Sequence, residues 1–222
     1  MTASANRSDG PPILPPTRQR PAPKAFLTVA EWRQLLVAAR ASSRRDEALL
    51  LLTYECGLRR EEPGLLRLSY IARLHERIVY LWRGKGSQTG DYELSATTAK
   101  ALHAWVNEAY PDREARRPES FVFPGYRRKG LTGRAVYAIY TQLAIAAGLP
   151  SNAHSPHALK RSRCQHILEA AERDGSIPVD RLVKSLAKIV GHRSAMTTVI
   201  HYTQQTKRER ELVQRVTDDL VE

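Results

Sequence analysis

The chain has 222 residues, with 35 Lys and Arg against 23 Asp and Glu, and therefore a formal net charge of +12. An apolar fraction of 42% with 26% charged residues excludes a wholly disordered chain and is typical of a globular protein. Uninterrupted apolar runs such as residues 48–52 are too short to span a bilayer, and no secretory leader is expected, since residues 1–24 are polar and proline-rich. Without a leader, Cys56 and Cys164 are expected to be reduced thiols in a cytosolic protein. The positive charge favours a polyanionic partner, of which nucleic acid is the commonest inside cells.

The first 24 residues differ in composition from the rest of the chain. They hold six of the thirteen prolines and a net charge of +3, from four basic residues and one acidic residue. Proline fixes φ and removes a backbone donor, so this segment is predicted to be a flexible or extended arm. It is either a solvated tail or a basic arm that follows DNA phosphates. Residues 25–222 are predicted to form one folded domain.

The folded part begins with two helices. A helix is predicted from Thr28 to about Arg40, because Thr28 and Glu31 form a capping box. A nearly all-apolar helix follows over residues 46–56, and Gly57 ends it.

A small antiparallel sheet and further helices are predicted after these two. Residues 78–82 and 91–94 flank a glycine-rich polar turn, the pattern of a β-hairpin, and residues 121–123 resemble a further short strand. Helices are predicted over residues 98–109, 132–147, 156–172, 179–190, 194–202 and about 207–220. The predicted fold class is therefore mainly α (α+β), with a small antiparallel sheet or hairpin.

Five short motifs place reactive side chains where local structure would fix them. Taken singly, each has an ordinary structural interpretation, such as a surface arginine neutralised by a neighbouring glutamate or a histidine in a turn. In chain order they are Cys56-Gly57-Leu58-Arg59-Arg60-Glu61-Glu62, Arg83-Gly84-Lys85-Gly86-Ser87, Ser155-Pro156-His157-Ala158-Leu159-Lys160, Ile189-Val190-Gly191-His192-Arg193-Ser194 and Met196-Thr197-Thr198-Val199-Ile200-His201-Tyr202-Thr203.

In order and spacing, these motifs resemble the catalytic domain of the tyrosine recombinase (phage integrase) family. That family shows a T-G-L-R-x-x-E box, a G-K-G hairpin, S-P-H-x-L-R, L-G-H, and a tyrosine just after paired threonines. The resemblance covers about residues 27–203. It implies a DNA-cleaving and rejoining enzyme that forms a 3′-phosphotyrosine, acts on double-stranded DNA, and uses no metal or other cofactor.

The resemblance also assigns a role to each motif. Arginine forks bind two phosphate oxygens at once, lysine protonates a leaving oxygen, and histidine exchanges protons or donates to phosphate. The implied roles are Tyr202 as nucleophile, Arg59 as first phosphate ligand, Lys85 as general acid, His157 and His192 as acid/base or hydrogen-bonding groups, and Lys160 at the position of the second arginine.

Two features depart from the family pattern. Lys160 replaces an arginine and lacks the bidentate fork, so stabilisation of the transition state is expected to weaken; Arg161 is a substitute cation about 100° further around the helix. Tyr202 lies ten residues after His192 where the family usually has nine, and His201 occupies the usual position. A slip of one residue within a helix redirects the hydroxyl, whereas a loop or bulge absorbs it.

Architecture and partners follow from the same resemblance. A core-binding domain ahead of the catalytic region is not expected, and the segment after Tyr202 is expected to pack either on its own domain or on a neighbouring protomer. The protein is expected in the cytoplasm, associated with the nucleoid, as a homo-oligomer that forms a tetrameric synapse on DNA, with or without a second recombinase. Three alternatives remain: a recombinase-derived DNA-binding protein with weak or no strand transfer, a type IB topoisomerase, and a basic RNA-binding domain.

Overall fold

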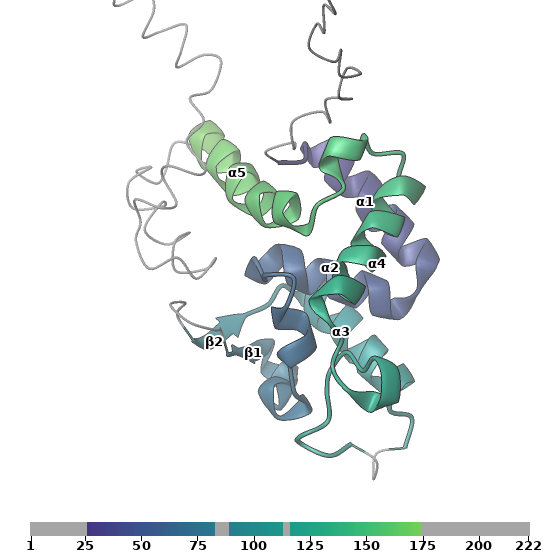
Figure 1. Ribbon diagram of the computed structural model, residues 1–222. Helices are drawn as coiled ribbons and strands as arrows, with labels where there is room; N and C mark the ends of the chain where they lie inside the picture. The colour runs from purple at the N-terminus through teal and green to yellow at the C-terminus, as the bar shows by residue number, and fades with distance from the viewer. Residues whose placement is uncertain (1–25, 83–88, 113–115, 175–222) are drawn as a thin grey trace, which may run out of the picture.

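The computed structural model describes residues 26–82, 89–112 and 116–174 (Figure 1). Helices dominate this part and its two strands form an antiparallel pair, which confirms the predicted mainly α fold with a small sheet. None of the helices in these ranges is long and apolar enough to cross a membrane. The predicted arm over residues 1–24 and the helices predicted over 179–190, 194–202 and 207–220 lie outside the described residues.

The described elements follow the predicted order. The α-helices are α1 (Val29–Ser42), α2 (Arg44–Cys56), α3 (Ala96–Ala109), α4 (Gly133–Ala146) and α5 (Pro156–Asp174). The strands are β1 (Ile78–Leu81) and β2 (Gly90–Glu93). Short 3₁₀ helices connect them: η1 (Glu62–Leu65), η2 (Leu68–Ile71), η3 (Leu74–Glu76), η4 (Tyr126–Arg128) and η5 (Ser151–Ala153).

Capping residues determine where the first two helices begin. The predicted capping box of Thr28 and Glu31 is present at the start of α1. Ser43 has an extended backbone and separates α1 from α2, and its hydroxyl accepts the Asp46 N–H at 3.1 Å. α2 therefore begins two residues before the predicted start at Asp46, because Ser43 is the N-cap and Asp46 lies inside the first turn.

α2 lies between two clusters of buried side chains. Leu49, Leu51 and Leu52 belong to a larger cluster that contains α3 and the sheet. Leu50 belongs to a second cluster, which joins α1, α4 and the start of α5. Because α2 has core on both sides, its run of leucines does not alternate with polar residues, and this explains the nearly all-apolar sequence pattern.

The sheet has the predicted hairpin order, but the strand predicted over residues 121–123 does not form. In the hairpin, Val79 pairs with Tyr92 and Leu81 with Gly90, and both Val79 and Leu81 are buried. Phe121 makes an isolated bridge to Arg67, and residues 122 and 123 fill the core without a partner strand. The pattern of residues 121–123 therefore reflects burial in the core and not a ladder of strand hydrogen bonds.

Two glycines let the backbone after Arg59 touch the backbone before α4. A methyl group on Gly64 would collide with the carbonyl group of Leu131, and one on Gly130 would collide with the carbonyl group of Gly64. Both obstacles are backbone atoms, which cannot move aside by changing a rotamer. This contact joins η1 to the loop that leads into α4.

Gly64→Ala is expected to destabilise the fold by about 1–3 kcal/mol, the range seen for overpacked interiors. Gly90→Ala is the control, because a methyl group on Gly90 meets no atom within 4 Å. Thermal and urea unfolding of both variants measure the difference. Equal stability of the two variants would contradict the close backbone contact.

Candidate functional site

Arg59 lies just beyond the end of α2. Gly57 adopts the left-handed conformation (φ 58°, ψ 42°) and its N–H donates to carbonyl groups of the last turn of α2. Leu58 follows as a buried residue, and its N–H donates to the Thr53 carbonyl at 3.1 Å. The chain leaves the core at Arg59, whose side chain is 42% exposed. The helix end and the buried leucine together fix the position from which the guanidinium extends.

Glu62 contacts Arg59 through both of its carboxylate oxygens. One carboxylate oxygen accepts the backbone N–H of Arg59 at 2.8 Å, and the other lies 3.3 Å from a guanidinium nitrogen. The Glu62 side chain is only 6% exposed, so this contact is shielded from solvent on the protein side. The sequence suggested a surface arginine neutralised by Glu62. The structure confirms the pairing and gives it a further effect, because the buried carboxylate orients the guanidinium.

The second group of predicted site residues opens α5. The Ser155 hydroxyl accepts the N–H of His157 at 3.2 Å and so caps the helix, and the side chain of His157 is exposed. Lys160, three residues later, is only 3% exposed. The Nε atom of Arg161 is buried and has no hydrogen-bond partner within the described ranges. The helix therefore presents an imidazole to solvent and carries a buried ammonium on a nearby face.

Two side chains of α5 hold the backbone of Leu27, immediately before α1. The Leu27 N–H donates to the Ser162 hydroxyl at 2.8 Å, and the Leu27 carbonyl lies 2.8 Å from Nε2 of His166. Ser162 and His166 are four residues apart, so they share one face of α5. Ser162 and the side chain of Leu27 are fully buried, so water does not compete for these bonds.

The other ring nitrogen of His166 reaches α2. Its Nδ1 lies 2.7 Å from the hydroxyl of Tyr54, whose ring stacks on Trp32 of α1 with centroids 3.9 Å apart. With Nε2–H donating to Leu27, the neutral imidazole accepts the Tyr54 O–H at Nδ1. Burial lowers the pKa of His166, and burial also raises the pKa of Tyr54. Both shifts favour the neutral groups that this hydrogen-bond chain requires.

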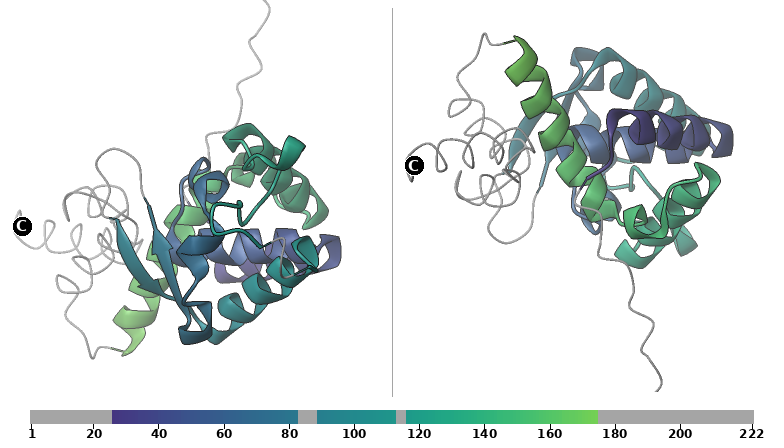
Figure 2. Two further views of the ribbon diagram at one scale, coloured as in Figure 1. Left: turned by 90° about the horizontal axis from the view of Figure 1, so that it is seen from below. Right: turned by 90° about the horizontal axis from the view of Figure 1, so that it is seen from above.

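The two described groups of candidate site residues lie on or next to helices that pack against each other. α5 lies across the C-terminal half of α2, where Tyr54 contacts His166, and Arg59 follows the end of that same helix (Figures 1 and 2). Arg59 and the turn containing His157 and Lys160 are therefore carried by neighbouring elements. Lys85, His192 and Tyr202 lie outside the described residues. Sequence reasoning did not single out Ser162, Tyr54 or His166, because their partners are distant in the chain.

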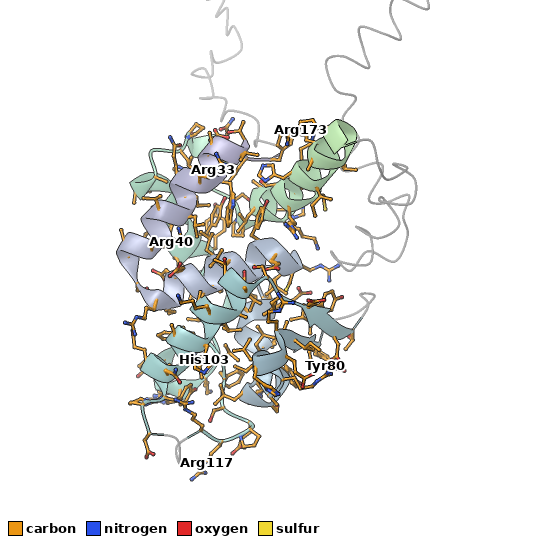
Figure 3. The ribbon with its side chains drawn as sticks, turned by 180° about the vertical axis from the view of Figure 1, so that it is seen from behind. Arg33, Arg40, Tyr80, His103, Arg117 and Arg173 are labelled. Atoms are coloured by element: carbon orange, nitrogen blue, oxygen red, sulfur yellow. The ribbon has the colours of Figure 1, made fainter. Side chains whose placement is uncertain are left out.

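Positive charge by itself does not mark the site. Figure 3 shows Arg33 and Arg40 along α1, Arg173 near the end of α5 and Arg117 at the opposite end of the fold. Arg40 also pairs with Glu47 at 2.8 Å. Since basic side chains occur on several faces, the candidate site is defined by Arg59 and the first turns of α5.

Comparison with known proteins identifies a family over most of the chain. The model of the phage integrase family matches residues 25–209. Tyrosine recombinase XerC of Pseudomonas aeruginosa is 33% identical over 160 residues, which are 72% of this chain and 47% of that protein. Tyrosine recombinase XerD of Xanthomonas axonopodis is 30% identical over 206 residues, covering 88% of this chain and 64% of that protein. The chain thus spans about half to two thirds of the length of these relatives.

Solved structures show the same fold. The crystal structure of XerA recombinase matches with a TM-score of 0.68 and 21% identity, over 88% of this chain and 66% of that one. The XerH recombinase bound to its difH substrate, in a pre-cleavage complex, matches with a TM-score of 0.61 and 18% identity, over 87% of this chain and 54% of that one. A lambda integrase dimer bound to a core site matches with a TM-score of 0.59 and 17% identity, over 82% of this chain and 49% of that one.

The lowered pKa of His166 makes a pH-dependent contribution to stability. The folded state favours the neutral imidazole, so the unfolded chain binds more protons once the pH falls below the ordinary value of about 6.5. The contribution is complete above that value and is lost as the pH falls toward the folded-state pKa. Urea unfolding at about pH 7.5 and about pH 5.5 is expected to show a larger loss for the wild type than for His166→Gln. Parallel losses would contradict this linkage.

Proposed function

The chain belongs to the phage integrase family of tyrosine recombinases, and we propose that it cleaves and rejoins strands of duplex DNA through a 3′-phosphotyrosine on Tyr202. One observation carries the proposal for this chain. The helix that ends just before Arg59 packs against the helix whose first turns carry His157 and Lys160, so two motifs distant in sequence lie beside packed helices. Cations at such a place suit a phosphodiester, which is anionic and gains charge on its oxygens during attack.

In this proposal, Arg59 and Lys160 bind the non-bridging oxygens of the phosphate. The side chain of Arg59 is 42% exposed and is backed by the buried carboxylate of Glu62, so the guanidinium is placed at the surface where a phosphate can approach it. Lys160 contributes one ammonium from a buried position, with a charge that solvent screens weakly. His157, exposed at the start of α5, donates to the phosphate or accepts a proton.

The proposed step forms one bond and breaks one. The hydroxyl oxygen of Tyr202 attacks phosphorus and gives its proton to His157 or His192, while the bond from phosphorus to the 5′-oxygen breaks. Lys85 donates a proton to that leaving oxygen and so yields a 5′-hydroxyl. Rejoining is the reverse reaction with a 5′-hydroxyl of the partner strand. The bond energy is kept in the phosphotyrosine, so no cofactor is needed.

The proposed partner is double-stranded DNA. The XerH structure contains its difH substrate and the lambda integrase structure is a dimer on a core site, which supports a DNA partner for a chain of the same fold. The further proposal is a tetrameric synapse of this protein, alone or with a second recombinase, on nucleoid DNA in the cytoplasm. The net charge of +12 favours such a partner.

A second candidate function is DNA binding with weak or no strand transfer. Lys160 favours it, because an ammonium cannot make the two parallel hydrogen bonds of a guanidinium. The ten-residue spacing from His192 to Tyr202 favours it as well. A protein of this kind binds duplex DNA in a salt-sensitive way and forms no covalent adduct.

Tyr202→Phe is expected to abolish a covalent protein–DNA adduct while leaving duplex binding within about twofold, because it removes only the attacking oxygen. The assay traps the adduct on nicked suicide duplexes built from DNA that flanks the gene, with binding measured in parallel. An adduct that persists in Tyr202→Phe would assign the nucleophile elsewhere. Binding without an adduct in the wild type would favour the second candidate function.

Lys160→Arg is expected to raise the rate of adduct formation several-fold, because it restores bidentate contact with the phosphate. Lys160→Met, which keeps a long unbranched side chain without charge, is expected to lower the rate by about tenfold or more. Single-turnover cleavage at saturating DNA measures both, and circular dichroism checks folding. Equal rates for Lys160 and its Met variant would remove Lys160 from the proposed phosphate site.

A further inference from the structure

A chain of hydrogen bonds links the two helices that carry the described site residues. We propose that Tyr54 and His166 are positioning residues, which fix Lys160 of α5 relative to Arg59 beyond the end of α2. The inference rests on the proposed function only in taking Arg59 and Lys160 as ligands of one phosphate. Neither Tyr54 nor His166 is assigned a contact with DNA.

The location of the two residues makes this connection short. Tyr54 is in the last turn of α2, and from there the chain passes through the helix cap at Gly57 to Arg59. His166 is on α5, about two turns after Lys160. A helix transmits a displacement along its axis because its backbone bonds are satisfied internally. The 2.7 Å contact between Tyr54 and His166 therefore sets how α2 and α5 lie against each other near the site.

The hydrogen bond of the Tyr54 hydroxyl can be removed without changing the packing of the Tyr54 ring. The ring of Tyr54 stacks on Trp32 with planes 11° apart, and the guanidinium of Arg163 lies 5.5 Å from the centre of the same ring. Removal of the hydroxyl keeps both ring contacts, leaves Nδ1 of His166 without this partner, and also removes the interaction of the hydroxyl with Arg163 of the same helix α5. Because the contact is part-buried, water replaces that partner incompletely.

The second ring nitrogen of His166, Nε2, anchors α5 to the segment that leads into α1. Nε2 of His166 holds the Leu27 carbonyl, and Ser162 holds the Leu27 N–H, so α5 is fixed at two points to the chain entering α1. Tyr54 then determines how this unit sits on α2. Phosphoryl transfer depends on sub-ångström placement of its charged groups, and a small tilt of α5 would move Lys160 away from the phosphate that Arg59 binds.

Tyr54→Phe tests the proposal, with Tyr110→Phe as its control. Tyr110 is also buried, its hydroxyl donates to the Phe121 carbonyl at 2.7 Å, and an arginine guanidinium lies 5.6 Å from its ring, but it caps the end of α3 and is not at the junction with α5. Single-turnover cleavage of the suicide duplex is expected to slow about tenfold in Tyr54→Phe and less than twofold in Tyr110→Phe. Duplex affinity is expected to stay within about twofold in both.

Two substitutions of His166 separate its two bonds. Asn carries an oxygen near the position of Nδ1 and retains the acceptor for Tyr54, whereas Gln carries a donor near Nε2 and retains the bond to Leu27. His166→Asn is expected to keep more of the cleavage rate than His166→Gln. In the Tyr54→Phe background the advantage of Asn over Gln is expected to disappear, because the hydroxyl that Asn accepts is gone and only Gln still holds Leu27.

Amide hydrogen exchange on the full chain bound to duplex DNA gives a readout that does not require cleavage. Residues 157–166 are expected to exchange faster in Tyr54→Phe than in the wild type and to be unchanged in Tyr110→Phe. If the wild type forms no adduct, the proposed function fails while this comparison still decides whether Tyr54 holds α5. Equal exchange, or equal cleavage in the two tyrosine variants, would overturn the positioning role.

Discussion

The burial of α2 on both sides is the constraint on which the rest of the structure depends. Its leucines enter two separate core clusters, so the helix can neither rotate nor slide without exposing apolar surface to water. The ending of α2 at Gly57 and the buried Leu58 then fix the point at which Arg59 leaves the core. The proposed phosphate ligand Arg59 thus follows directly on a helix that core packing holds on two sides.

Local patterns in the sequence predicted what local physics determines. The capping box of Thr28, the glycine that ends α2 and the hairpin around residues 78–94 are each encoded within a few neighbouring residues. The prediction of a strand over residues 121–123 was wrong because an apolar triplet is equally typical of a segment that fills a core. In a run of three residues, burial in a core and pairing in a sheet produce the same apolar sequence pattern.

The sequence indicates candidate site residues, but it does not indicate the side chains that hold the elements carrying them. Order and spacing of motifs predict Arg59, His157 and Lys160 as members of one site, and this stays a prediction; α2 and α5, the helices beside these residues, contact each other through Tyr54 and His166. The burial of Lys160 and the hydrogen bonds from Ser162 and His166 to Leu27 were not predictable. Those bonds end on the backbone of a residue more than a hundred positions away. Because every residue type has the same backbone carbonyl group, the sequence does not show which one accepts the bond from His166.

The contact between Gly64 and Gly130 has a consequence for how related chains can change in length. Since two backbones touch there with no side chain between them, a shift of either segment cannot be absorbed by a change of rotamer elsewhere. Insertions and deletions are therefore tolerated within the exposed turn around η4, between the fixed points, and not at the glycines themselves. In evolutionary terms, this junction keeps the register between Arg59 and the start of α4 while the turn beside it is free to vary.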